Sequence, residues 1–127
     1  MAKVLGLALA ALMFITGVTH FTAPAYYRKL VPAWIPAAPG VVALSGLLNL
    51  AAAALLAAPA TRRGGGWAMA ALITAYLDAH LDDVRHARAA SGINDRPLGV
   101  ALRIIANLGY IACALIVART APPPRRG

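Results

Sequence analysis

The sequence predicts an all-α membrane protein: a bundle of four transmembrane helices with an interfacial loop, rich in proline and aromatic residues, between the first and the second helix. Two observations lead to this fold class. Hydrophobic residues make up 61% of the 127-residue chain and charged residues only 13%, whereas soluble domains are about 45–50% apolar and about 25% charged. The apolar residues also gather in four runs, each close to the roughly 20 residues that a helix needs to cross a bilayer.

The first run covers residues 4–21 and follows Lys3. Together with the stretch Ala23-Pro24-Ala25 it also fits a secretory signal peptide with its cleavage site. The run is longer than the roughly 7–15 apolar residues of such a peptide, and a proline lies inside the cleavage stretch. We therefore expect an uncleaved membrane helix.

Residues 22–40 form the interfacial loop, because their four prolines exclude a long helix. Tyrosine and tryptophan side chains prefer the level of the lipid headgroups. We therefore expect Tyr27 and Trp34 at the membrane surface, with Arg28 facing water or lipid phosphates.

The remaining runs cover residues 41–58, 67–83 and 98–118. Helices are the default for such runs, because a strand in lipid leaves its backbone polar groups unsatisfied. Residues 59–66, with three consecutive glycines, are expected to form a tight turn, and residues 84–97 a polar connection. Residues 1–121 are thus predicted to be a single membrane domain, and residues 122–127 an extended or disordered tail rich in proline and arginine.

The net charge of +8 does not indicate a nucleic-acid partner. Basic pairs such as Arg28-Lys29 and Arg62-Arg63 flank the apolar runs, as in proteins that contact anionic lipid headgroups. A nucleic-acid interface would gather them on one stripe. The basic residues divide evenly between the two sides of a four-span topology, and only Arg103, which falls inside a span, tips the count. We expect both termini in the cytoplasm, in a bacterial plasma membrane.

Six polar residues are expected in one half of the bundle, where they would surround a ligand site: His20, Ser45, Asn49, Asp78, Arg103 and Asn107. A rise of about 1.5 Å per residue puts Asp78 and Arg103 at one depth, so we expect them to form an ion pair. Asn49 and Asn107 also match in depth and are expected to bond across helices. Three interpretations stay open: structural hydrogen bonds within the bundle, a cavity for a polar headgroup or a quinone-like ring, and contacts with a partner protein.

A metal site is a weaker hypothesis. Asp82 and His86 are four residues apart, as are Asp78 and Asp82, and His20 is a further candidate ligand from the first helix. No specific metal motif is present, and neither is a paired nucleophile and base, so we do not expect the protein to be catalytic by itself. The single cysteine, Cys113, excludes an intramolecular disulfide.

The first half of the chain resembles the DoxX-like membrane proteins, over about residues 5–76. The resemblance rests on Gly17-Val18-Thr19-His20-Phe21, on the prolines and aromatic residues of the loop, on Ser45-Gly46 and on Pro59 followed by Thr61-Arg62-Arg63. The chain departs from the family's pattern at Asn49, where an acidic residue is usual. The resemblance implies a small four-helix membrane protein of a kind that in some cases accompanies oxidoreductases, and the family's name comes from subunits of a thiosulfate:quinone oxidoreductase.

We therefore expect an accessory subunit of a larger membrane complex, such as a quinone-dependent oxidoreductase. It would carry no cofactor of its own, with quinone or lipid as candidate ligands. Its partners would be membrane lipids and other subunits or further copies of the chain. The alternative is an independent oligomeric transporter or a lipid- or quinone-binding membrane protein.

Overall fold

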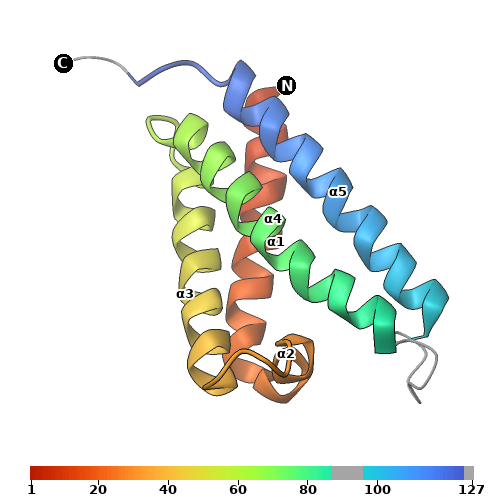
Figure 1. The fold of residues 1–127 in the computed structure, drawn as a ribbon. Helices are drawn as coiled ribbons and strands as arrows, with labels where there is room; N and C mark the ends of the chain where they lie inside the picture. Colours follow the sequence, from red (N-terminus) through yellow and green to blue (C-terminus); the bar gives the residue numbers. More distant parts are fainter. Residues whose placement is uncertain (87–95, 125–127) are drawn as a thin grey trace.

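The computed structural model describes residues 1–86 and 96–124, and these residues are helical apart from short connections and the end of the chain (Figure 1). The all-α prediction is confirmed. The helices are α1 (Ala2–Thr22), α2 (Pro24–Leu30), α3 (Ala38–Ala57), α4 (Arg62–His86) and α5 (Pro97–Thr120).

The long helices pack as two pairs, α1 with α3 and α4 with α5, and α3 packs against α4 to join the pairs. The short helix α2 lies across the end of the bundle where α1 ends and α3 begins, while the start of α1 and the end of α5 lie at the opposite end (Figure 1). The bundle therefore has two distinct ends, which we call the α2 end and the terminal end.

Three helices, α1, α3 and α5, are long and apolar enough to cross a membrane, as expected of an integral membrane protein. The prediction of four transmembrane helices is wrong, because among the described helices α4 lacks the required hydropathy. Its first turn carries Arg62 and Arg63, and its last third carries Asp78, His80 and Asp82. These side chains offset the apolar residues between them.

The predicted turn at residues 64–66 is also wrong, because these glycines lie inside α4. A Cβ atom on Gly65 would lie 2.6 Å from the backbone nitrogen of Leu56, and one on Gly66 would lie 2.7 Å from that of Ala118. The absence of side chains at these two positions lets α4 approach the backbones of α3 and α5. Here the glycines serve helix packing rather than chain reversal.

Proline positions explain the boundaries of α2. Pro24 occupies the first position of α2, where its missing N–H costs nothing. The helix ends at Leu30, just before Val31, which takes an extended conformation ahead of Pro32. The predicted interfacial segment is thus a seven-residue helix followed by an irregular stretch.

The apolar core lies mainly in the half of the bundle next to the start of α1 and the end of α5. It is built mainly from small and medium-sized side chains of the four long helices: Leu9, Ala10, Met13, Ala52, Ala53, Leu56, Met69, Ala70, Ile73, Ala114, Val117 and Ala121. Small residues allow the close backbone approach on which helix packing in membranes depends. The half beside α2 contains polar residues such as His20 and Asn49 together with apolar ones.

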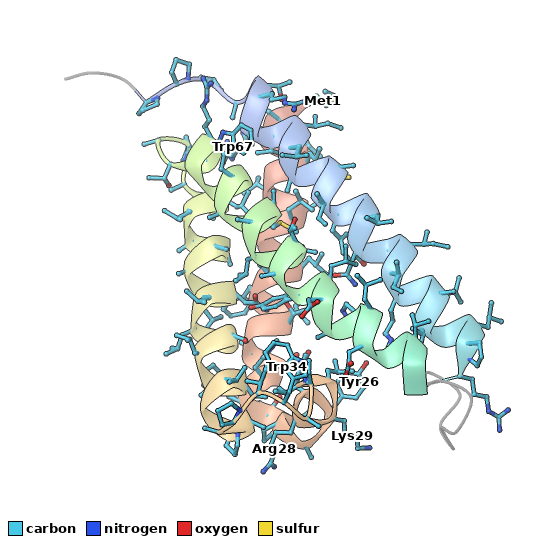
Figure 2. The ribbon with its side chains drawn as sticks, in the orientation of Figure 1. Met1, Tyr26, Arg28, Lys29, Trp34 and Trp67 are labelled. Atoms are coloured by element: carbon cyan, nitrogen blue, oxygen red, sulfur yellow. The ribbon has the colours of Figure 1, made fainter. Side chains whose placement is uncertain are left out.

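Aromatic and basic side chains mark the two ends of the bundle (Figure 2). Tyr26, Arg28, Lys29 and Trp34 lie around the α2 end, and Trp67 lies near the terminal end. The two tryptophans are exposed, Trp34 by 71% and Trp67 by 48%. Exposed tryptophans at the two ends of a bundle are typical of residues that lie at the headgroup levels of a bilayer.

Candidate functional site

A cavity of about 530 Å³ lies at the α2 end of the bundle, between the two helix pairs. All five described helices line it, α1 with residues 12–20, α3 with residues 41–49, α4 with residues 73–80 and α5 with residues 103–110. Tyr26, Tyr27 and Leu30 of α2, with Val31, Pro32 and Ile35 that follow, form its cover. Its volume falls within the roughly 300–1,000 Å³ of small-molecule sites.

The structure places the six polar residues that the sequence singled out around this one cavity. They come from four different helices: His20 from α1, Ser45 and Asn49 from α3, Asp78 from α4, and Arg103 and Asn107 from α5. His20 and Asn49 are buried, at 7% and 3% exposure. Whether these residues bind a ligand stays a prediction, but they share one hollow space.

Asn49 links three helices through its amide. Its nitrogen Nδ2 donates to Thr16 Oγ1 of α1 at 3.3 Å, and its oxygen Oδ1 accepts from the hydroxyl of Tyr76 of α4 at 3.0 Å. The same hydroxyl lies 3.2 Å from the carbonyl oxygen of Ser45. A buried amide satisfied at both ends fixes the relative positions of α1, α3 and α4.

His20 and Thr19 connect α1 to the cover of the cavity. The His20 ring stacks on the Tyr27 ring, with centroids 3.7 Å apart and planes 19° apart. The Tyr27 hydroxyl lies 2.6 Å from Thr19 Oγ1, and Thr19 in turn donates to the carbonyl of Thr16. The Nδ1 atom of His20 lies 2.6 Å from that same carbonyl. A stack and a hydrogen bond thus hold α2 against α1.

The predicted ion pair between Asp78 and Arg103 is absent from the described residues. Asp78 lines the cavity and is exposed. Arg103 also lines the cavity, is half-buried on α5, and interacts with another group of the protein. Equal depth along two helices does not fix the rotation of each helix. The two residues therefore share the lining without pairing.

The predicted bond between Asn49 and Asn107 is wrong as well. The Asn107 nitrogen Nδ2 donates to the carbonyl oxygen of Arg103, one turn earlier on the same helix, at 2.7 Å. The Asn49 amide is hydrogen-bonded to Thr16 and Tyr76 instead. Local bonding to its own helix leaves Asn107 with no need of a cross-helix partner.

Sequence reasoning missed Thr16 and Tyr76. Both lie within apolar runs, where a threonine and a tyrosine are typical of ordinary helix packing. The signal that was present is the hydroxyl of Tyr76, because a tyrosine buried away from water needs a hydrogen-bond partner. Tyr76 lies about as far from the end of the third apolar run as Asn49 lies from the start of the second. Because these two ends meet on one side of the bundle, the two residues are at similar depth.

The three residues predicted at the membrane surface divide into two groups. Trp34 and Arg28 are exposed, as expected for the interface. Tyr27 is half-buried and turns toward His20 and Thr19. Tyr27 therefore belongs to the wall of the cavity and not to the surface.

Nothing in the described part of the chain gathers three residues of the metal-binding types. Asp82 does not line the cavity. The side chain of His86, the other weak candidate ligand, lies outside the described residues.

Two titratable groups of α4, which is not one of the three candidate spans, are shifted by their surroundings. Burial raises the pKa of Tyr76, against a smaller opposite effect of its hydrogen bond to Ser45. Burial, and after it the positive charge of Arg103, lowers the pKa of His80. At neutral pH the Tyr76 hydroxyl therefore keeps its proton as a donor, and the His80 ring is neutral.

The model of the family described as Domain of unknown function (DUF8561) matches residues 9–118. The matched range includes every residue that lines the cavity. No curated protein and no solved structure matches the chain. Since no DoxX family match accompanies the DUF8561 match, the resemblance to DoxX-like proteins stays a prediction.

Proposed function

This chain belongs to the DUF8561 family, and we propose that it is a small integral membrane protein that binds an amphipathic molecule, a lipid or a quinone, in the cavity under α2. The observation that carries the proposal is the cavity itself, about 530 Å³ in volume and lined by all five described helices. The apolar core lies mainly in the other half of the bundle, and Met13 and Ile73 belong both to the core and to the cavity lining. A fold that packs one half closely and leaves a cavity with a mostly apolar lining and a few polar groups in the other has a place for a ligand.

The lining favours a molecule with a polar head and an apolar body. Polar groups such as Asn49, Tyr76 and His20 meet apolar side chains such as Leu12 and Ile73 in the same space. Sites of this kind bury the body of a ligand against apolar walls and orient it through a few polar contacts. Lipids and quinones have this character, and both are concentrated in the membrane that α1, α3 and α5 are suited to cross.

The aromatic residues at the two ends of the bundle support a proposed position of the molecule in the bilayer. Tyr26 and Trp34 at one end and Trp67 at the other would lie at the two headgroup levels. The cavity would then open near one headgroup level, where the head of an amphipathic molecule resides. We also propose a bacterial plasma membrane, with the terminal end of the bundle facing the cytoplasm.

An accessory role in a quinone-linked complex stays a prediction. The outer face of α5 is apolar and exposed at Leu98, Leu102 and Ile105. Such a face suits lipid as well as another subunit, so it does not favour the accessory role over an independent protein. The cavity, in contrast, supports ligand binding both for an accessory subunit and for an independent protein.

Photo-crosslinking in proteoliposomes tests the proposal. The probes are a phospholipid with a diazirine on its acyl chain and a short-chain quinone with an azide. We expect labels concentrated on residues 12–20 and 103–110 for at least one probe. Ala106 lines the cavity, so the variant Ala106→Phe should remove this labelling.

The matched control is Ala112→Phe, which places the same ring on an exposed part of α5 outside the cavity. This control should keep the wild-type labelling pattern. Labels spread evenly over the outer faces of the helices, with no effect of Ala106→Phe, would contradict the proposal.

A further inference from the structure

The cavity is too shallow to hold a whole membrane lipid. Its lining covers residues 12–20 of α1 and 41–49 of α3, which at a rise of 1.5 Å per residue corresponds to about 12 Å along the bundle. One lipid chain reaches across half of the hydrocarbon core, about 15 Å, and the head group adds to that length. An amphipathic molecule whose head lies in the cavity must therefore extend its chain out of it.

The chain has no way out toward the terminal end. The apolar core closes the bundle there, and Leu56, Met69 and Val117 within it are fully buried. Met13 and Ile73 belong both to the core and to the lining, so the cavity ends where the core begins. The remaining ways out are the sides of the bundle and the cover.

Three sides of the bundle are closed. Between α1 and α3, a Cβ atom on Gly17 would lie 3.2 Å from the carbonyl oxygen of Gly46, so the two backbones are in contact. Between α3 and α4, the Tyr76 hydroxyl bonds to Asn49 and to the carbonyl of Ser45. The helices α4 and α5 run side by side as a closely packed pair (Figure 1). None of these sides leaves a passage for a hydrocarbon chain.

The side between α1 and α5 is different. The two helices lie together at the terminal end and separate toward the α2 end, where the cavity lies (Figure 1). Ala106 and Tyr110 of α5 line the cavity and are also exposed, Tyr110 by 36%. On the α3 and α4 side, Asn49 and Ile73 line the cavity and are buried, at 3% and 4% exposure. The cavity therefore reaches the protein surface between α1 and α5.

The surface beside this opening is apolar. Next to the lining residues of α1 and α5, the side chains of Ile15 and Ile105 are exposed by 60% and 64%. Both helices are candidate membrane spans, so this side of the bundle suits the hydrocarbon region. The cover, in contrast, carries the exposed Arg28 and Lys29 on α2. An apolar chain is favoured at the side opening and disfavoured beside these charges.

From these contacts we infer that the cavity holds only the head and the first part of its ligand, and that the chain passes between α1 and α5 into the hydrocarbon region of the membrane. This inference rests on the proposed binding function and specifies the class of ligand: a long-chain molecule that enters sideways from the leaflet at the α2 end. A molecule with the same head and no such chain should bind more weakly, because it buries less apolar surface.

Photo-crosslinking of the full chain in mild detergent tests the inference. The probes are a phosphatidylethanolamine and a long-chain quinone, each made with a diazirine either next to the head or at the end of the chain. Specific labels are those that an excess of the unlabelled probe removes. We expect the diazirine next to the head to label the cavity lining, and the diazirine at the chain end to label α1 and α5 outside the lining.

Two exposed tyrosines of the lining distinguish the side opening from the cover. Tyr110 lies at the opening and Tyr26 lies on α2, and they are exposed by similar fractions, 36% and 41%. Tyr110→Ala should widen the opening and speed the release of a bound long-chain probe severalfold. Tyr26→Ala is the matched variant and should speed release less. Native mass spectrometry after dilution into probe-free detergent follows the loss of the bound probe.

Chain-end labels on α2, α3 or α4, or on the same lining residues as the head labels, would overturn the inference. Release from Tyr26→Ala at least as fast as from Tyr110→Ala would overturn it as well. In each of these cases, specific labelling of the lining by the diazirine next to the head leaves the proposed function standing. The absence of specific labels in the lining with both probes would count against the proposed function, and the inference would fall with it.

Discussion

The imidazole of His20 and the phenol ring of Tyr27 stack face to face, with centroids 3.7 Å apart. This contact joins the end of α1 to the short helix α2 and closes one side of the cavity. The Tyr27 hydroxyl adds a hydrogen bond to Thr19, 2.6 Å away. The Tyr27 side chain thus holds the cover of the cavity through two contacts, the ring stack with His20 and the hydrogen bond with Thr19.

Substitution of Tyr27 should separate these two contacts. Tyr27→Phe keeps the stack and loses the hydrogen bond, at a cost of about 1 kcal/mol in the free energy of unfolding. Tyr27→Ala loses both and should cost about 1 kcal/mol more. Tyr26→Phe is the matched control, because no described residue is hydrogen-bonded to the Tyr26 hydroxyl. Unfolding titrations in mixed micelles measure all three, and equal losses for Tyr27→Phe and Tyr26→Phe would refute the role of the hydroxyl.

Asn49 should matter far more than Asn107. Asn49→Ala leaves the partner groups on Thr16 and Tyr76 unsatisfied in a buried site, which we expect to cost about 2–3 kcal/mol. Asn107→Ala loses one bond within its own helix and should cost less than about 1 kcal/mol. The same unfolding titration compares the two, and a larger loss for Asn107→Ala would contradict the hydrogen-bond network described for the site.

Gly46 should not tolerate a side chain. A Cβ atom there would lie 2.7 Å from the Phe21 ring and 2.8 Å from the Cβ of His20, so Gly46→Ala must push α1 and α3 apart. We expect a loss of about 1–3 kcal/mol. Nothing lies within 4 Å of a Cβ on Gly109, and Gly109→Ala should be neutral or stabilising by up to about 1 kcal/mol. Thermal unfolding of both variants decides the matter, and a stable Gly46→Ala bundle would show that the helices are less tightly packed.

Arg62 should stabilise the bundle, whereas its neighbour Arg63 should not. The Arg62 side chain is buried and donates to the carbonyls of Leu56 and Ala57 at the end of α3, at 2.8 and 2.7 Å. Arg62→Ala leaves these carbonyls without their charged donor and should cost about 2 kcal/mol. Arg63 is exposed, so Arg63→Ala should change stability by less than about 0.5 kcal/mol. Equal effects of the two substitutions on the free energy of unfolding would show that the bonds from Arg62 to the end of α3 do not stabilise the bundle.

Asp78 and Arg103 should behave as independent residues. Because no ion pair joins them within the described residues, the losses from Asp78→Asn and Arg103→Gln should add in the double variant to within about 0.5 kcal/mol. A double-mutant cycle on unfolding free energies measures this coupling. A coupling well above that value would show that the two charges pair in the membrane.

The convergence of the polar residues could be predicted from the sequence because it depends only on chain direction and depth. Runs of similar length that reverse direction bring the end of one helix beside the start of the next. His20, Asn49 and Arg103 therefore fall in the same half of the bundle whatever the details of packing. The helical character of the chain is confirmed, whereas the four predicted membrane spans are reduced to three candidates.

The individual partners could not be predicted, because they depend on the rotation of each helix and on competing local acceptors. Asn107 turns to a carbonyl of its own helix, and Asn49 finds Tyr76, a residue that reads as ordinary packing in sequence. The beginning of α4 was missed because three consecutive glycines usually break a helix. Here backbone contacts at Gly65 and Gly66 leave no room for side chains.

The central claim, that the cavity holds an amphipathic molecule, is tested most directly by the mass of the intact chain isolated from its membrane in mild detergent. We predict a bound small molecule, at most one per chain, in the wild type and in Ala112→Phe, and the bare chain mass in Ala106→Phe. A bare mass for the wild type, or the same adduct in Ala106→Phe, would contradict the claim.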